Sequence, residues 1–206
     1  MSVKIKICGI TQYEDARVAA NLGVDALGFI FYEKSARYIP PKKAGEIIAK
    51  LPPFISKVGV FVDAHPTSIM QAASESGIDT VQLHGNEPPQ TALRLPFTII
   101  KAFSVSPDWD MSVLDTYPAA GFLLDTWDTD KKGGTGKTCD WQIAKSAALR
   151  HKNIILAGGL GPVNIKEALE AVQPYAVDVN SGVEIKPGIK NPHKVKEVVA
   201  IVKSWQ

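Results

Sequence analysis

The hydrophobic and polar positions of this chain follow one repeating pattern along its whole length. Eight short apolar runs are rich in Val, Ile, Leu and Phe, and few of them alternate cleanly with polar residues. This pattern is typical of strands that are buried on both faces of a parallel sheet. The predicted strands are residues 3–8, 26–31, 56–62, 80–83, 98–103, 121–124, 153–156 and 176–179.

An amphipathic stretch follows each predicted strand, and we expect each stretch to form a helix. Thr11 is a plausible N-cap for the first helix. Pro41 and Pro66 open two others in the first turn, where the missing N–H of proline is tolerated. The predicted helices are residues 13–22, 41–51, 66–76, 88–95, 109–116, 141–150, 162–173 and 192–204.

Strictly alternating strands and helices predict a parallel sheet with right-handed crossovers. Eight units in 206 residues leave roughly 26 residues for each, which is compact for a barrel fold that usually has about 250 residues. An open, doubly wound sheet would need a glycine-rich dinucleotide loop after the first strand, where the sequence is Cys8-Gly9-Ile10-Thr11. No linker divides the chain, so we expect one (β/α)8 TIM barrel domain over residues 1–206.

The composition is that of an ordinary globular protein, with 45% hydrophobic and 21% charged residues. A formal charge of +2 and scattered lysines argue against a nucleic-acid partner, and no apolar run approaches the ~18 residues of a membrane span. Cys8 and Cys139 could form one disulfide bond, but the chain opens without the pattern of a signal peptide. We therefore expect a cytoplasmic protein with reduced thiols.

In barrels of this kind, catalytic side chains cluster where the strands end. The predicted strand ends carry a thiol, a guanidinium, carboxylates, an imidazole and two glycine turns, at Cys8, Arg37, His84, Asp125, Gly158, Gly159, Asp178, Ser181 and Gly182. The four histidines are isolated in the sequence, so we expect no metal site.

Two glycine-containing turns end the seventh and eighth strands, at residues 156–160 (LAGGL) and 179–183 (VNSGV). Glycines also occur in turns that have only a structural role. However, backbone amides after these two strands commonly hold a phosphate group in barrel enzymes. The pair of turns therefore predicts a small, phosphorylated substrate.

Residues 133–138 (GGTGKT) imitate a nucleotide-binding P-loop. That motif requires another glycine five positions before Gly136, where the sequence has Lys131. We therefore predict no nucleotide cofactor, and interpret the segment as a lid that excludes water once substrate is bound.

Cys8 and Asp125 are the candidate base and acid. Strand alternation places Lys4, Lys6 and Cys8 on one face, and Val3, Ile5 and Ile7 on the other face, which suits the helix layer. An inward Lys6 near Cys8 would favour the thiolate, although Lys6 could instead pair with an interior carboxylate such as Asp178. Asp125 ends the apolar run at residues 122–124 and so enters a partly desolvated mouth, which suits a proton donor.

These motifs together resemble those of the phosphoribosylanthranilate isomerases, in the order in which that family has them. The matching segments are KICGIT at residues 6–11, SARY at 35–38, QLHG at 82–85, LD at 124–125, GGTG at 133–136, LAGGL at 156–160 and DVNSGVE at 178–184. The resemblance covers nearly the whole chain and implies a TIM barrel that catalyses an Amadori rearrangement in tryptophan biosynthesis.

The resemblance also implies roles for single residues. Cys8 would be the general base, Asp125 the general acid, and Arg37 the partner of the anthranilate carboxylate. His84 and Asp178 would contact the substrate, and the two glycine turns would hold its phosphate. The chain departs from the family pattern at Ala36, Cys139 and Asn180, where proline, an aromatic residue and serine are common, and these departures concern substrate placement rather than the reaction.

Two other functions share some of these features. The sugar isomerase of histidine biosynthesis performs the same rearrangement on a substrate with two phosphates, and it would need a second phosphate cradle and commonly an acidic residue in place of Cys8. A phosphate-binding module without catalysis would need neither Cys8 nor Asp125. The isomerase needs no metal, nucleotide or redox cofactor. We expect a monomer or a homodimer.

Overall fold

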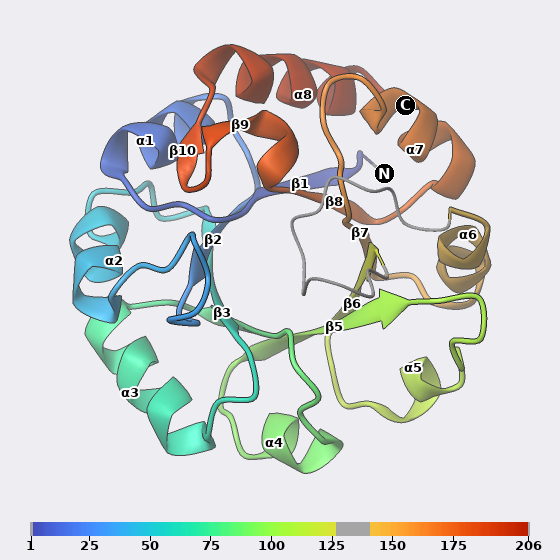
Figure 1. Ribbon diagram of the computed structural model, residues 1–206, viewed down its shortest axis with the longest axis horizontal. Helices are drawn as coiled ribbons and strands as arrows, with labels where there is room; N and C mark the ends of the chain where they lie inside the picture. The colour runs from blue at the N-terminus through green and yellow to red at the C-terminus, as the bar shows by residue number, and fades with distance from the viewer. Residues whose placement is uncertain (1, 127–140, 206) are drawn as a thin grey trace.

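The computed structural model describes residues 2–126 and 141–205, and eight parallel strands form a closed barrel within them (Figure 1). β1 pairs with β8 in the register Lys6↔Asp178, which closes the ring. The strands are β1 (Lys4–Ile7), β2 (Ala26–Ile30), β3 (Ser56–Phe61), β4 (Thr80–Leu83), β5 (Thr98–Val105), β6 (Gly121–Thr126), β7 (Ile154–Leu156) and β8 (Ala176–Val179). The predicted TIM barrel is confirmed.

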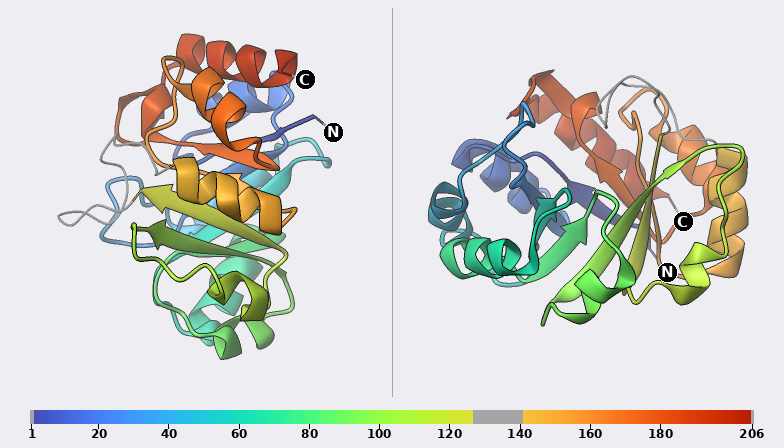
Figure 2. Two further views of the ribbon diagram at one scale, coloured as in Figure 1. Left: turned by 90° about the vertical axis from the view of Figure 1, so that its right-hand side faces the viewer. Right: turned by 60° about the horizontal axis from the view of Figure 1, so that its bottom comes forward.

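The helices surround the barrel as an outer layer, as the views in Figures 1 and 2 agree. Each of them connects one strand to the next, except for the last, which follows β8. They are α1 (Tyr13–Asn21), α2 (Pro41–Ile48), α3 (Pro66–Ser76), α4 (Pro89–Leu93), α5 (Val113–Thr116), α6 (Trp141–Arg150), α7 (Ile165–Val172) and α8 (Pro192–Ser204).

The starts of α5 and α7 and the N-cap of α1 differ from the prediction, because local side chains make other contacts there. The Asp110 carboxylate accepts hydrogen bonds from the Ser112 backbone N and hydroxyl, so α5 begins after this turn rather than at residue 109. The Asn164 side chain accepts from Gly161 N, so α7 begins at residue 165 rather than 162. Thr11 is not the N-cap of α1: its hydroxyl donates to the Gly188 carbonyl, and residue 12 occupies the cap.

A small hairpin between β8 and α8 was not predicted. A 3-10 turn, η1 (Ser181–Val183), leads into β9 (Glu184–Lys186), which pairs antiparallel with β10 (Ile189–Lys190). Gly188 makes the turn with φ +81°, a conformation that favours glycine. The hairpin lies beside α1 and α8 in Figure 1.

The apolar side chains form two separate layers. The larger layer lies between the strands and the helices, where Ile5 and Ile7 are fully buried. A smaller cluster fills the barrel interior with mostly small side chains, Ala102, Leu123, Ile155, Ala157 and Ala176. Lys6 is buried on the interior side of β1, as the alternation of that strand predicted, whereas Lys4 is exposed at the open amino end of the barrel. The interior therefore has room for polar side chains.

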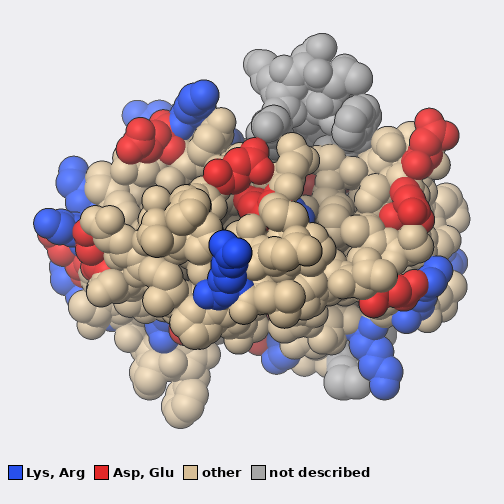
Figure 3. All heavy atoms as spheres, turned by 90° about the horizontal axis from the view of Figure 1, so that it is seen from below, with Lys and Arg blue, Asp and Glu red and all other residues tan. Residues whose placement is uncertain are grey.

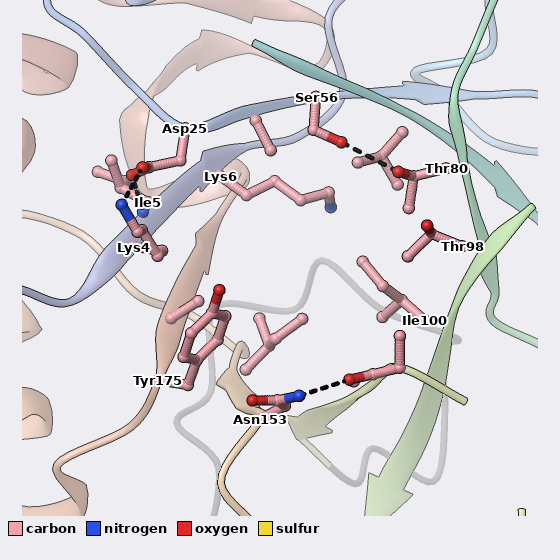
Figure 4. A pocket seen from close by; sticks show the side chains of 16 residues that line it. Lys4, Ile5, Lys6, Asp25, Ser56, Thr80, Thr98, Ile100, Asn153 and Tyr175 are labelled. Carbon is pink, nitrogen blue, oxygen red and sulfur yellow. Dashed lines mark hydrogen bonds and ion pairs between the residues drawn. The ribbon is translucent and has the colours of Figure 1, made fainter. Parts of the chain in front are cut away.

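The amino end of the barrel holds a cavity of about 400 Å³ (Figure 4). Four of its polar side chains bond to one another: Lys4 pairs with Asp25 at 2.9 Å, and the Ser56 and Thr80 hydroxyls lie 3.0 Å apart. None of the nine predicted site residues lines it.

Among the described residues, no helix is long and apolar enough to cross a membrane, and no group of His, Cys, Asp and Glu side chains is arranged to bind a metal ion. On the face drawn in Figure 3, acidic and basic side chains are interspersed rather than gathered into one patch.

Candidate active site

A second cavity, of about 460 Å³, opens at the carboxyl ends of the strands. It brings together eight of the nine predicted site residues: Cys8, Arg37, His84, Asp125, Gly158, Gly159, Asp178 and Ser181. The ninth, Gly182, lies directly behind the cavity wall, because a Cβ added to it would meet the Leu160 carbonyl oxygen at 2.0 Å. The residues predicted from strand ends therefore converge on one site. The predicted lid and Cys139 lie outside the described residues.

Cys8 lies just past the end of β1, beside a buried ion pair. Lys6 Nζ donates to Asp178 Oδ2 at 2.9 Å, and both side chains are almost fully buried. Gly28 on the neighbouring strand leaves the space that these groups occupy, since a Cβ there would lie 2.6 Å from the Cys8 sulfur and 3.1 Å from Lys6 Cε. Lys6 therefore pairs with Asp178, and it also interacts with the Cys8 sulfur.

Lys6 favours the Cys8 thiolate, as the sequence predicted for an inward ammonium, but burial of the sulfur outweighs this effect. Burial raises the pKa of the Cys8 thiol, and the nearby Lys6 ammonium lowers it without overcoming burial. The Asp178 carboxylate opposes Lys6 and raises the pKa of Cys8 further. The pKa of Lys6 is itself raised, because its attraction to Asp178 and Cys8 exceeds the effect of burial. Cys8 is thus a thiol near neutral pH.

Asp178 also offers a free acceptor to a ligand. Its second carboxylate oxygen, Oδ1, is buried and has no hydrogen-bond partner among the described residues, while the side chain lines the cavity. A buried acceptor without a partner costs free energy, on the order of 1–3 kcal/mol. A hydroxyl or N–H group of a bound ligand would remove that cost.

Asp125 extends from β6 across the cavity from β1 and lies next to His84. His84 Nε2 and Asp125 Oδ2 are 3.5 Å apart, and Gln82 Nε2 lies 2.8 Å from His84 Nδ1. With the Gln82 amide as the donor, the imidazole hydrogen sits on Nε2 and faces Asp125. The sequence identified His84 and Asp125. Gln82 lies in the QLHG motif at residues 82–85, but the sequence gave it no role, because its contact with His84 depends on the fold.

Arg37 reaches the cavity from the loop after β2, and Glu184 already holds one edge of its guanidinium. Nε donates to Glu184 Oε1 at 2.9 Å, and Nη2 donates to Oε2 at 2.7 Å. Burial alone would raise the pKa of Glu184, but the Arg37 bonds and the charge of Lys190 hold it below its ordinary value. Glu184 lies in the motif at residues 178–184 without an assigned role, and Lys190 lies in no motif, so the sequence missed both.

The two glycine turns pack backbone against backbone. Gly158 and Gly159 have φ values of +89° and +61°, which favour glycine. A Cβ at Gly161 would lie 3.0 Å from the Gly182 carbonyl oxygen, so no side chain separates the turns. They form one continuous backbone surface at the edge of the cavity, as a site for a phosphate group requires.

The cavity at the mouth of the barrel is surrounded by an acid, a base, a guanidinium and two glycine turns. This combination agrees with one family of enzymes. The sequence model of N-(5'phosphoribosyl)anthranilate (PRA) isomerase matches residues 5–201. The chain belongs to the phosphoribosylanthranilate isomerase family. The N-(5'-phosphoribosyl)anthranilate isomerase of Geobacter metallireducens is 48% identical over 202 residues, which are 98% of this chain and 100% of that protein.

Solved structures of the family have the same fold. A phosphoribosylanthranilate isomerase in complex with reduced 1-(o-carboxyphenylamino)-1-deoxyribulose 5-phosphate matches with a TM-score of 0.88 and 40% identity, over 98% of this chain and 100% of that one. Monomers generated from the dimeric isomerase of Thermotoga maritima match with a TM-score of 0.88 and 39% identity, over the same shares of the two chains. The protein is thus an isomerase with the fold that its sequence predicted.

Proposed function

We propose that the cavity at the carboxyl ends of the strands converts N-(5'-phosphoribosyl)anthranilate to 1-(2-carboxyphenylamino)-1-deoxyribulose 5-phosphate, an Amadori rearrangement of tryptophan biosynthesis. The observation that carries this proposal is the convergence of Cys8 and Asp125, from β1 and β6, on one cavity that also holds Arg37 and the two glycine turns. The reaction needs one proton donor and one proton acceptor on either side of a small anionic substrate.

Asp125 is the proposed general acid. It gives a proton to the ring oxygen of the ribose while the bond from that oxygen to the anomeric carbon breaks. The electron pair of the anthranilate nitrogen forms the double bond of an iminium ion. His84, 3.5 Å from the carboxylate, is placed to hold Asp125 in the orientation that this transfer requires.

Cys8 is the proposed general base. The Cys8 thiol first loses its own proton to solvent through the mouth of the cavity. The resulting thiolate takes the proton from the second sugar carbon, and the electrons of that C–H bond neutralise the iminium and give an enolamine. Protonation of the first carbon, with loss of the proton from the hydroxyl on the second carbon, then gives the ketone. Although burial raises the pKa of the Cys8 thiol, the positive charge of the iminium forms next to it and favours the thiolate when it is needed.

The remaining predicted residues bind the substrate. Arg37 offers its unoccupied N–H groups to the anthranilate carboxylate, and the glycine turns surround the phosphate with backbone N–H groups. The partnerless Oδ1 of Asp178 is suited to accept a hydrogen bond from a sugar hydroxyl or the amine. No cofactor takes part in this scheme.

We also propose that the protein acts in the cytoplasm as a monomer or a homodimer, with its small phosphorylated substrate as its partner and neither a nucleic acid nor a membrane. A base that is a free thiol favours a reducing compartment. The interspersed surface charges and the net charge of +2 favour a small anionic partner over a polyanion.

The test is turnover. Phosphoribosylanthranilate is fluorescent, and the proposal expects its fluorescence to disappear as the purified protein isomerises it. Turnover only of the histidine-pathway substrate, with its two phosphates, would replace this assignment with that of the related sugar isomerase. Binding of phosphate with turnover of neither substrate would leave a phosphate-binding module and refute the proposal.

A further inference from the structure

A buried cluster of three charged side chains lies between the cavity and the hairpin β9–β10. Glu184 accepts three hydrogen bonds from Arg37, and its Oε1 also accepts one from Lys190 Nζ at 3.0 Å. The exposed fractions of the Glu184 and Lys190 side chains are 5% and 2%. Of the three, only Arg37 lines the cavity. We call these three residues the hairpin cluster.

The fold fixes the Glu184 carboxylate from several sides. Glu184 and Lys190 face each other across the hairpin, and the Gly188 N–H donates to Glu184 Oε1 at 3.0 Å. Lys190 is held in turn, since its backbone N donates to Asp15 Oδ2 at 2.8 Å and its ammonium to Asn180 Oδ1 at 3.0 Å. These contacts therefore hold the hairpin cluster in place without a ligand.

Glu184 determines which edge of the Arg37 guanidinium faces the cavity. The edge formed by Nε and Nη2 is occupied by Glu184, and Nη1 lies on the opposite side of the planar guanidinium. The stem of Arg37 is confined as well, because a Cβ at Gly9 would lie 2.9 Å from Arg37 Cδ. A guanidinium that is already oriented loses less conformational entropy when it binds a carboxylate.

Lys190 keeps the cluster positive. A single Arg–Glu pair would be electrically neutral and would offer little attraction to an anion. Two cations around one carboxylate leave a net charge of +1 next to the cavity. Glu184 can thus orient Arg37 without cancelling the charge that a substrate carboxylate requires.

We propose that Glu184 is a positioning residue that makes the site selective for substrates with an ortho-carboxylate on the aromatic ring, by presenting the free edge of Arg37 to that group. The inference rests on the proposed role of Arg37 as the carboxylate partner. It assigns to the hairpin β9–β10 a part in substrate selection, although neither Glu184 nor Lys190 lines the cavity.

The experiment compares two product analogues, 1-(2-carboxyphenylamino)-1-deoxyribulose 5-phosphate and its phenylamino counterpart without the carboxylate. Wild type should bind the carboxylated compound more tightly by a large factor. Glu184→Gln should reduce this preference about tenfold or more, with the affinity for the phenylamino compound unchanged, and KM should rise far more than kcat falls. Glu197→Gln, on the exposed face of α8, is the matched control and should change neither affinity.

A second variant separates the effect of orienting Arg37 from the effect of the net charge of the cluster. It also avoids the excess buried charge that could prevent folding. Glu184→Gln alone leaves two buried cations without an anion, which can destabilise the fold. Glu184→Gln combined with Lys190→Met keeps the net charge of +1 and should still lose the preference. An unchanged preference in this double variant, or an equal loss for both analogues, overturns the inference. If wild type itself shows no preference, the role of Arg37 fails, and this inference fails with it while the isomerase activity stands.

Discussion

Cys8 is the residue at which burial and a nearby charge oppose each other most directly. Lys6 is in place to stabilise a thiolate, yet it is also bonded to Asp178, and the sulfur is buried. Burial disfavours a charged sulfur, and the carboxylate of Asp178 cancels much of the attraction from Lys6. Strand alternation could predict that Lys6 points inward. It could not predict which side chain the Lys6 ammonium would pair with, because that depends on the pairing of β1 with β8.

The first prediction is that free Cys8 titrates above the ordinary thiol pKa of about 8.5. The rate of Cys8 alkylation by iodoacetamide should rise with pH through a midpoint above that value, measured in a Cys139→Ser background so that only one thiol reacts. Lys6→Met should move the midpoint higher still, since the ammonium lowers the pKa of Cys8. A midpoint below 8.5 would contradict the dominance of burial, and Cys8→Ala with full turnover would exclude Cys8 as the base.

The second prediction concerns Asp125. Replacing it with asparagine keeps the shape of the side chain but removes the proton that opens the ribose ring. Turnover should fall by about 10²–10⁴, the usual worth of proton transfer by a positioned group. The affinity for the carboxylated product analogue should stay within a few fold of wild type, which shows that the cavity is intact. Near-normal turnover would remove Asp125 from the mechanism.

Elements with long, repeated patterns could be predicted from the sequence, and elements stabilised by single contacts could not. β4, β8, α3 and α8 have the predicted limits, because a short apolar run defines each strand and a proline begins each helix. The hairpin β9–β10 has strands of three and two residues, too short for any periodicity. It depends on distant partners such as Asp15, 175 residues away from Lys190. The same dependence explains why Glu184 could be located in a motif but not given a role.

The third prediction tests the glycine turn before β9. A Cβ at Gly182 would lie 2.0 Å from the Leu160 carbonyl oxygen, and backbone cannot move aside as easily as a side chain. Gly182→Ala should therefore displace the two turns from each other and raise both KM and the inhibition constant of inorganic phosphate, by tenfold or more, with no change in net charge.

Gly77→Ala is the matched control for this variant. Gly77 also has a left-handed φ, of +74°, at the end of α3, but the nearest atom to an added Cβ is 3.9 Å away. Gly77→Ala should lower the free energy of unfolding by about 1 kcal/mol and leave phosphate inhibition unchanged. Equal phosphate inhibition in wild type and Gly182→Ala would place the phosphate elsewhere.

At the scale of the whole molecule, two buried ion pairs lie on opposite sides of the strands. Lys6 and Asp178 lie inside the barrel, whereas Lys101 and Glu87 form a second buried pair, 3.0 Å apart, near the ring of Tyr117. Buried ion pairs are weak evidence for stability, because desolvation offsets much of the attraction.

The last prediction uses Tyr117, whose hydroxyl donates to the Glu87 carbonyl at 3.0 Å. Burial, with a smaller contribution from the Glu87 carboxylate, raises the pKa of Tyr117 to about 12 from an ordinary value of 10. The folded state thus resists ionisation of this phenol more than the unfolded state does. The contribution to the free energy of unfolding is fully present below pH 10 and is lost between pH 10 and about 12.

Urea unfolding of wild type and Tyr117→Phe from pH 8 to 11.5 measures this effect. At pH 8 the variant should be less stable by about 1 kcal/mol, because it lacks the hydrogen bond to Glu87. Above pH 10 wild type should lose stability faster than the variant, by up to about 1.4 kcal/mol for each pH unit, so the difference shrinks and then changes sign. Lys6, Cys8 and the other groups that titrate in this range are common to both proteins and cancel in the difference. If the free energies of unfolding of wild type and Tyr117→Phe changed in parallel from pH 8 to 11.5, Tyr117 would ionise as readily in the folded protein as in the unfolded chain.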